Sequence, residues 1–155
     1  MDTPLGPILV VEDDEGQAVL IRSFFERRSP GAVVRIASSG QEALDYLDGI
    51  PPYDDRAENP LPRVIILDLG LPDMNGFDVL RGLFVSKEYS DIPVIVFTAS
   101  TDPEDERMAY RLGVLAYKSK PDNFGDLAAI ALDVLQRDPE PGSLSPNDDD
   151  SEQEL

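Results

Sequence analysis

The chain has 155 residues, 31 acidic and 13 basic side chains, and a formal net charge of -18 at pH 7. This length predicts one domain with a proper hydrophobic core, and the charge argues against binding to nucleic acid, whose phosphates must be neutralised by Lys and Arg. The absence of Cys and His excludes disulfides, thiolate metal sites and a phosphohistidine on this chain.

The first part of the chain predicts a strand, a helix and a second strand. Residues 8–11 are apolar side chains of the kind found in strands buried on both faces, and four acids follow them directly. Asp14 can cap a helix over residues 15–28, with Gln17 as its partner in a capping box. Residues 32–37 indicate the second strand. The side chains expected on the core face of the helix are Leu20, Ile21, Phe24 and Phe25.

A second helix and a long connection come next. Ser39 and Glu42 form another capping box, and Gly49 ends the helix that they open. Residues 49–62 hold four prolines and cannot form the interior of a helix. A connection this long is either functional or a mobile insertion. We expect an insertion, with contact to a partner as the alternative, at the end of the sheet away from residue 68.

A second apolar run, residues 64–67, stops at Asp68. In an open parallel sheet, ligands bind beyond the carboxyl ends of the strands, so an acid at this position is a candidate for chemistry. Asn75 and Gly76 then open a third helix. Its apolar side chains on one side are Phe77, Leu80, Leu83 and Phe84.

Two further strands end near complementary groups. Residues 94–98 end on the hydroxyl of Thr98, and a strand over residues 114–117 is followed shortly by Lys120. Between them a helix is expected to start at Asp102 and Pro103 and to end at Gly113. A last helix is expected from about residue 123 to residue 137. Its inward side chains are expected to be Leu127, Ile130, Ala131, Val134 and Leu135.

The polar residues at these strand ends predict a magnesium site. Adjacent carboxylates at a strand tip repel one another, and a hard divalent cation relieves that repulsion. Glu12, Asp13 and Asp68 are the predicted ligands. Thr98 and Lys120, placed opposite a metal-bound carboxylate, can hold the oxygens of a phosphoryl group.

Five strand patterns alternate with five helix patterns, which predicts a doubly wound α/β domain. The ordered set of polar residues resembles the receiver domain of two-component response regulators over roughly residues 5–137. The resemblance implies a flavodoxin-like three-layer sandwich around a five-stranded parallel sheet of order 2-1-3-4-5. It also implies a phosphoacceptor signalling protein and not an enzyme with turnover.

The resemblance assigns a role to each position of the family's signature, which is filled here. The implied roles are phosphoacceptor for Asp68, metal ligand for Glu12, Asp13 and Asp68 and for the backbone carbonyl of Gly70, phosphoryl contact for Thr98 and Lys120, and aromatic switch for Tyr117. The donor would be a sensor histidine kinase.

A narrower resemblance is to the single-domain regulators that partner phytochrome-type histidine kinases. It rests on residues 43–47, on the long connection before the third strand and on the lack of an output domain. It implies a bacterial phytochrome as kinase. The surface formed by the fourth helix, fifth strand and fifth helix carries Arg107 and Arg111 opposite Asp126 and Asp133. We therefore expect a homodimer there, with contact to a separate effector as the alternative.

Other functions fit the sequence less well. A phosphatase of the haloacid dehalogenase type carries a second Asp two residues after its nucleophile, and here that position is Gly70. A dinucleotide binder needs a glycine-rich loop after its first strand, which residues 12–15 replace with acids. A degenerate receiver used as a scaffold is disfavoured by the intact signature. Neither Gly70 nor Ser100 can position a water with a carboxylate or amide, so we expect slow self-dephosphorylation.

Residues 138–155 contain seven acids, three prolines and no Lys or Arg. This composition predicts an acidic tail of the disordered type, with a docking element as the alternative. No apolar run approaches the ~20 residues of a membrane span, and the N-terminus lacks the pattern of a signal peptide. We therefore expect a cytoplasmic protein without a membrane partner.

Overall fold

The computed structural model describes residues 7–120 and 124–137. The predicted tail over residues 138–155 lies outside these residues, as does the predicted start of the last helix at residue 123. The elements in chain order are β1 (Ile8–Val11), α1 (Glu15–Arg28), β2 (Val34–Ala37), α2 (Gly40–Asp48), β3 (Val64–Leu67), α3 (Gly76–Val85), β4 (Val94–Thr98), α4 (Pro103–Leu112), β5 (Ala116–Ser119) and α5 (Phe124–Gln136).

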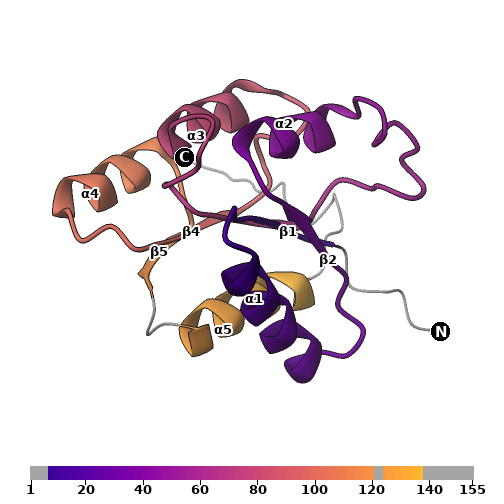
Figure 1. The fold of residues 1–155 in the computed structure, drawn as a ribbon, viewed down its shortest axis with the longest axis horizontal. Coiled ribbons are helices and arrows are strands. Elements are labelled where there is room, and N and C mark those ends of the chain that lie inside the picture. The colour runs from indigo at the N-terminus through magenta and orange to yellow at the C-terminus, as the bar shows by residue number, and fades with distance from the viewer. Residues whose placement is uncertain (1–6, 121–123, 138–155) are drawn as a thin grey trace, which may run out of the picture.

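The five strands form one parallel sheet of order β2-β1-β3-β4-β5, which confirms the predicted fold. Helices α1 and α5 cover one face of this sheet, and α2, α3 and α4 cover the other (Figure 1). No helix within the described residues is long and apolar enough to cross a membrane.

Two hydrophobic cores lie between these layers, one on each face of the sheet. Every side chain of β1 and β3 is buried, as expected for central strands with helices on both sides. Because alternate residues of a strand point to opposite faces, each of these strands supplies both cores. Val11 pairs with Leu67 in register, so the residues that follow the two strands start from neighbouring positions.

Strand β5 begins two residues later than the sequence predicts. The amide N–H groups of Gly113 and Val114 still donate to the carbonyl of Ala109, so the C-terminal cap of α4 extends through Val114. The chain becomes a strand only at Ala116, and β5 therefore ends at Ser119, directly before Lys120.

The predicted core face of α1 is wrong at one position. Leu20 is 50% exposed, whereas Ala18, Ile21 and Phe25 are buried. These three residues have the spacing of one helical face, and Leu20 lies about 100° around the helix from Ile21. Phe24 packs partly buried against the same core.

The connection over residues 49–62 is tied to α2, which differs from the loose insertion that we expected. The guanidinium of Arg56 donates to the carbonyls of Tyr46, Leu47 and Asn59. The hydroxyl of Tyr46 in turn donates to the carbonyl of Pro60. Arg56 thus donates to carbonyls in the last turn of α2, where that of Tyr46 also accepts from the amide N–H of Gly49.

Candidate functional site

The candidate site lies beyond the carboxyl ends of the central strands. The amide N–H of Asp68 donates to the carbonyl of Val11 at 3.1 Å, which continues the pairing of β3 with β1 past the last strand residue. The amide N–H of Glu12 donates in the same way to the carbonyl of Ala37 on β2. The backbones of both acids are therefore fixed by the sheet. Both side chains are buried, with Glu12 3% and Asp68 9% exposed.

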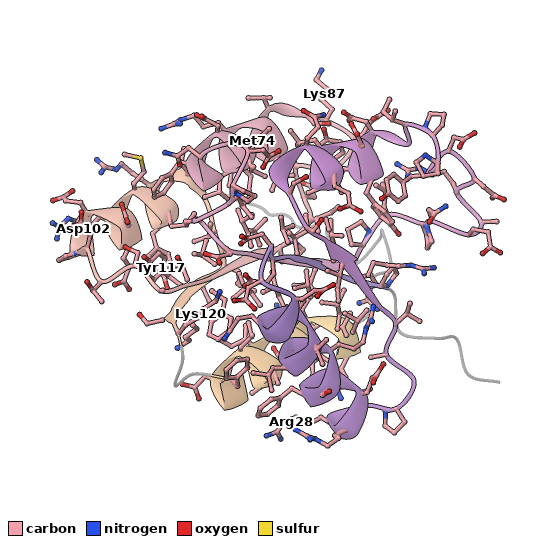
Figure 2. All side chains as sticks on the ribbon, viewed as in Figure 1. Arg28, Met74, Lys87, Asp102, Tyr117 and Lys120 are labelled. Atoms are coloured by element: carbon pink, nitrogen blue, oxygen red, sulfur yellow. The ribbon has the colours of Figure 1, made fainter. Side chains whose placement is uncertain are left out.

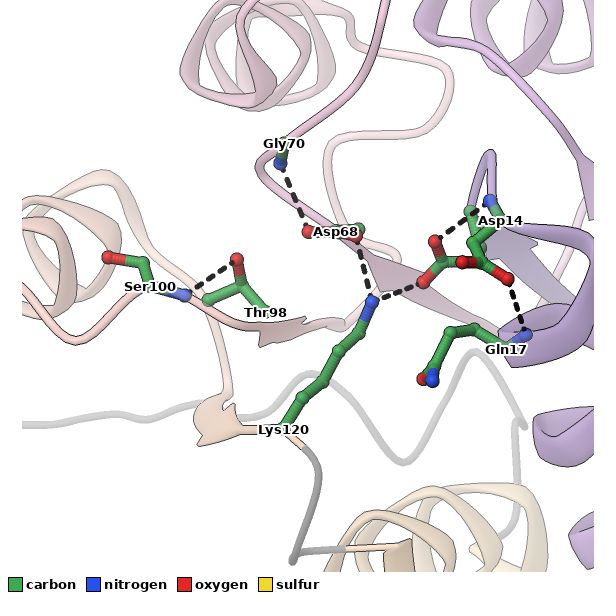
Figure 3. Close-up of polar contacts among 8 residues, drawn as sticks. Asp14, Gln17, Asp68, Gly70, Thr98, Ser100 and Lys120 are labelled. Carbon is green, nitrogen blue, oxygen red and sulfur yellow. Dashed lines mark hydrogen bonds and ion pairs between the residues drawn. The ribbon is translucent and has the colours of Figure 1, made fainter.

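Lys120 joins these two acids. Its Nζ lies 2.5 Å from Oε1 of Glu12 and 2.9 Å from Oδ2 of Asp68 (Figure 3). Burial disfavours the charged amine, but the hydrogen bonds to Asp68 and Glu12 outweigh it and raise the pKa of Lys120. Burial raises the pKa of Glu12, against the opposing effect of Lys120. Lys120 thus compensates negative charge that burial makes costly.

Three carboxylates at this end of the sheet fit a divalent cation. One oxygen from each of Glu12, Asp13 and Asp68 lies within 4.8 Å of the others. Oxygen ligands from a few carboxylates suit Mg²⁺, which keeps several of its own waters. Asp13 is exposed, so the group opens to solvent on one side. The three predicted ligands are therefore brought together.

The loop after Asp68 is held on two sides. The amide N–H of Gly70 donates to Oδ1 of Asp68 at 3.0 Å. A Cβ on Gly76 would lie 2.5 Å from the Cα of Leu69, so only glycine allows the start of α3 to pack against this loop. The carboxylate of Asp73 accepts hydrogen bonds from the amides of residues 40 and 41 at the start of α2. These contacts fix the Asp68 carboxylate and the segment that follows it.

Thr98 lies on the side of Asp68 away from Glu12. Its side chain is buried, and its Oγ1 accepts a hydrogen bond from the amide N–H of Ser100 at 3.4 Å. Asp68, Thr98, Ser100 and Asp105 line one cavity of about 410 Å³. A phosphoryl group on Asp68 would border this cavity.

Tyr117, the predicted switch residue, is 8% exposed and already lies inward. It lies on the side of β5 toward Asp102 at the start of α4 (Figure 2). Its Oη has no hydrogen-bond partner within the described residues. Its backbone N–H donates to the Oη of Tyr110 on α4 at 3.1 Å. Burial raises the pKa of the Tyr117 hydroxyl, the neighbouring Ser100 side chain opposes that rise, and the negative charges of Asp105, Glu106 and Asp102 add to it.

Three contacts in this region were not predicted from the sequence. They are the Ser100–Asp105 hydrogen bond of 2.6 Å, the Tyr110–Tyr117 hydrogen bond and the Asp73 contacts to α2. Asp105 lies three positions after the N-cap residue Asp102, where an acidic residue usually indicates a capping box. The sequence alone does not show that the loop after β4 brings Ser100 into hydrogen-bonding contact with Asp105.

Residues 8–132 match the family model described as the response regulator receiver domain. The probable methanogenesis regulatory protein FilR2 of Methanothrix harundinacea is 39% identical over 129 residues, which cover 83% of this chain and 81% of FilR2. Response regulator Rcp1 of Synechocystis sp. is 31% identical over 124 residues, which cover 80% of this chain and 82% of Rcp1.

Solved structures of response regulators are also similar to this chain. The crystal structure of the Mn²⁺-bound form of Rcp1 has a TM-score of 0.72 and 29% identity, covering 83% of this chain and 91% of that one. The structure of the bacteriophytochrome response regulator RtBRR has a TM-score of 0.69 and 37% identity, covering 90% of this chain and 86% of that one.

Proposed function

Since this chain belongs to the response regulator receiver family, we propose that it accepts a phosphoryl group on Asp68 from the phosphohistidine of a sensor histidine kinase. The observation that carries the assignment to Asp68 is its position at the end of β3, buried, with Lys120 on one oxygen and the Gly70 amide on the other. The chain is a signalling protein and not a classical enzyme.

The chemistry requires little of the protein beyond position and charge. A carboxylate nucleophile needs no base, so an oxygen of Asp68 can form the bond to phosphorus as the bond from phosphorus to the donor's imidazole nitrogen breaks. Lys120 neutralises negative charge on the incoming group, and the Thr98 hydroxyl can donate to one of its oxygens. Mg²⁺ held by Glu12, Asp13, Asp68 and the carbonyl of Gly70 would supply further positive charge at this point.

We further propose a phytochrome-type kinase as the donor. The structure of RtBRR supports this choice, since it is described as that of a bacteriophytochrome response regulator and covers 90% of the present chain. A cytoplasmic location accompanies this role, because the kinase draws its phosphoryl group from ATP in the cytoplasm.

We also propose that phosphorylation of Asp68 acts by changing the association of two copies of the chain through the surface formed by α4, β5 and α5. Exposed Tyr110 and Leu115 give this surface apolar contact area. The charges that we expected to pair across a twofold axis are largely paired within one protomer. These pairs are Arg107 with Glu104, Asp126 with Lys118, and Asp133 with Arg137. Apolar contact therefore supports the dimer better than the charge pairs do.

The experiment that tests the proposed function is phosphoryl transfer from purified kinases, including a phytochrome kinase, and from acetyl phosphate. We expect Asp68→Asn to abolish hydroxylamine-labile labelling, because an amide is a far poorer nucleophile than a carboxylate. Asp78→Asn, which alters an exposed acid on α3, serves as the matched control and should label as the wild type does. Labelling of Asp68→Asn at the wild-type rate would refute the assignment, and a faster rate from one kinase would identify the partner.

A further inference from the structure

Phe97 on β4 and Lys120 after β5 belong to the same face of the sheet. Phe97 pairs in register with Lys118, and Lys120 follows Lys118 by two positions, so alternation along the strand directs both side chains to one side. The amide N–H of Lys120 donates to the carbonyl of Thr98 at 2.8 Å, which continues this pairing past the end of β5. The shared side is the one that α1 and α5 cover, where Phe97 is part of the core.

The ring of Phe97 lies beside the ammonium of Lys120. The Nζ of Lys120 is 5.8 Å from the centroid of the ring. Phe97 is 1% exposed, and only 10% of the Lys120 side chain is exposed. An ammonium within about 6 Å of a ring centroid is attracted by the negative face of the ring, and the attraction is stronger where the two groups are shielded from water. The contact therefore stabilises Lys120 in this position.

Two further phenylalanines hold the ring of Phe97. Phe124, at the start of α5, meets it edge-on, with centroids 5.0 Å apart and ring planes at 76°. Phe124 in turn stacks on Phe24 of α1, with centroids 5.6 Å apart and ring planes at 8°. Aromatic pairs at these separations and angles attract one another. Helices α1 and α5 thus fix the surface against which the ammonium of Lys120 lies.

Lys120 needs such a surface because two acids compete for it. Its Nζ lies 2.5 Å from Oε1 of Glu12 and 2.9 Å from Oδ2 of Asp68 (Figure 3). The side chain of lysine is a flexible stem with a compact charge, so on its own it can turn fully to Glu12. Positive charge would then be missing from the oxygen of Asp68 that it now contacts. A fixed ring beside the ammonium limits this movement.

We propose that Phe97 is a positioning residue for phosphoryl transfer, and that its ring holds the ammonium of Lys120 at Asp68. This inference rests on the proposed function of Asp68. Phe97 acts through Lys120 and forms no bond to the phosphoryl group. Its contribution is that positive charge is already in place when the negatively charged donor arrives, so less rearrangement is needed during the transfer.

The first measurement is a double-mutant cycle in urea without Mg²⁺, on Phe97→Leu, Lys120→Met and the variant with both changes. If the ring and the ammonium attract each other, the double variant shifts the unfolding equilibrium constant by roughly fivefold less than the product of the two single shifts. Phe25→Leu is the matched control, because Phe25 is fully buried in the same core, on α1. Its shift should simply multiply with that of Lys120→Met.

The second measurement is the rate of Asp68 labelling by saturating acetyl phosphate with Mg²⁺. We expect Phe97→Leu to label roughly fivefold more slowly than the wild type, the factor that loss of one such contact gives. Phe25→Leu should label at the wild-type rate. Phe124→Leu removes the edge-on contact at a half-buried position, so it should slow labelling by a smaller factor.

The outcomes separate the two proposals. Shifts of Phe97→Leu and Lys120→Met that simply multiply overturn the inference, and so does labelling of Phe97→Leu at the wild-type rate, while the proposed function stays intact. Equal slowing in Phe25→Leu also overturns it, because the effect then comes from general loss of packing. If Phe97→Leu does not fold, Phe124→Leu takes its place in both measurements, under the same criteria. Absence of labelling on the wild type refutes the proposed function, and with it the inference.

Discussion

The two sides of Asp68 are built differently. On one side, which we call the ion-pair side, Glu12, Asp13 and Lys120 each lie within two residues of the end of a strand. On the other, the hydroxyl side, Ser100 and Asp105 come from a loop and a helix and meet through one hydrogen bond. Charges on the ion-pair side are held by the sheet itself. The hydroxyl side depends on how α4 is set against β4 and β5, so it is the side that a small shift of α4 can change.

The first way to test this comparison is to remove the cation of the ion-pair side. Lys120→Met leaves the carboxylates of Glu12 and Asp68 buried together without their partner. Loss of one member of a buried charge cluster is costly, and we expect a decrease of roughly 3 kcal/mol in the free energy of unfolding without Mg²⁺. Urea unfolding in a chelating buffer at pH 7 measures it.

Lys118→Met, which removes a cation two residues earlier on β5, is the control. Nζ of Lys118 lies 3.9 Å from Oδ2 of Asp126, and 30% of the Lys118 side chain and 65% of the Asp126 side chain are exposed. A pair this open to solvent contributes about 0–1 kcal/mol to stability. If both substitutions lowered the free energy of unfolding equally, the buried Lys120 would matter no more for stability than the surface residue Lys118.

Removal of a predicted metal ligand should have the next largest effect. Asp13→Ala deletes one of the three carboxylates that lie within 4.8 Å of one another. We expect Mg²⁺ affinity to fall by roughly tenfold, because a water replaces one of few protein ligands. Calorimetric titration measures the affinity, with Glu15→Ala as a control for the loss of a nearby negative charge. Equal weakening in both variants would indicate general charge attraction and not a ligand.

The sequence predicted the ion-pair side, but on the hydroxyl side it missed the contact of Asp105 with Ser100, for a physical reason. A residue that directly follows a buried strand is placed by the register of the sheet, so Glu12 and Asp68 could be brought together once the first and third strands were taken as neighbours. That strand order came from the family resemblance and not from the strand patterns. Ser100 and Asp105 are separated by a helix start, and no periodicity encodes the path between them. The same limit applies to Leu20, where apolar character did not decide which way the side chain faces.

Two tyrosines provide a smaller test on the hydroxyl side. Tyr110→Phe removes the acceptor for the backbone N–H of Tyr117, and we expect a loss of about 1 kcal/mol of stability. Tyr117→Phe removes a buried hydroxyl that has no partner within the described residues, so we expect no loss or a gain below about 1 kcal/mol. Urea unfolding of both variants compares them. A larger loss from Tyr117→Phe would show that its hydroxyl makes a stabilising contact.

The smallest expected effect is on the titration of Tyr117. Burial, with the negative charge of Asp105, holds the pKa of this hydroxyl above its ordinary value of 10.0. A raised pKa means that the folded protein favours the neutral hydroxyl. The resulting contribution to stability is fully present below pH 10 and is lost as the pH rises through the pKa of the folded state.

Asp105→Asn removes one of the charges that oppose ionisation, so it should lower the pKa of Tyr117 toward that ordinary value. Ultraviolet titration of tyrosinate, with Tyr117→Phe subtracted to isolate the residue, measures this change. An unchanged pKa in Asp105→Asn would mean that the carboxylate of Asp105 contacts Ser100 without influencing the hydroxyl of Tyr117.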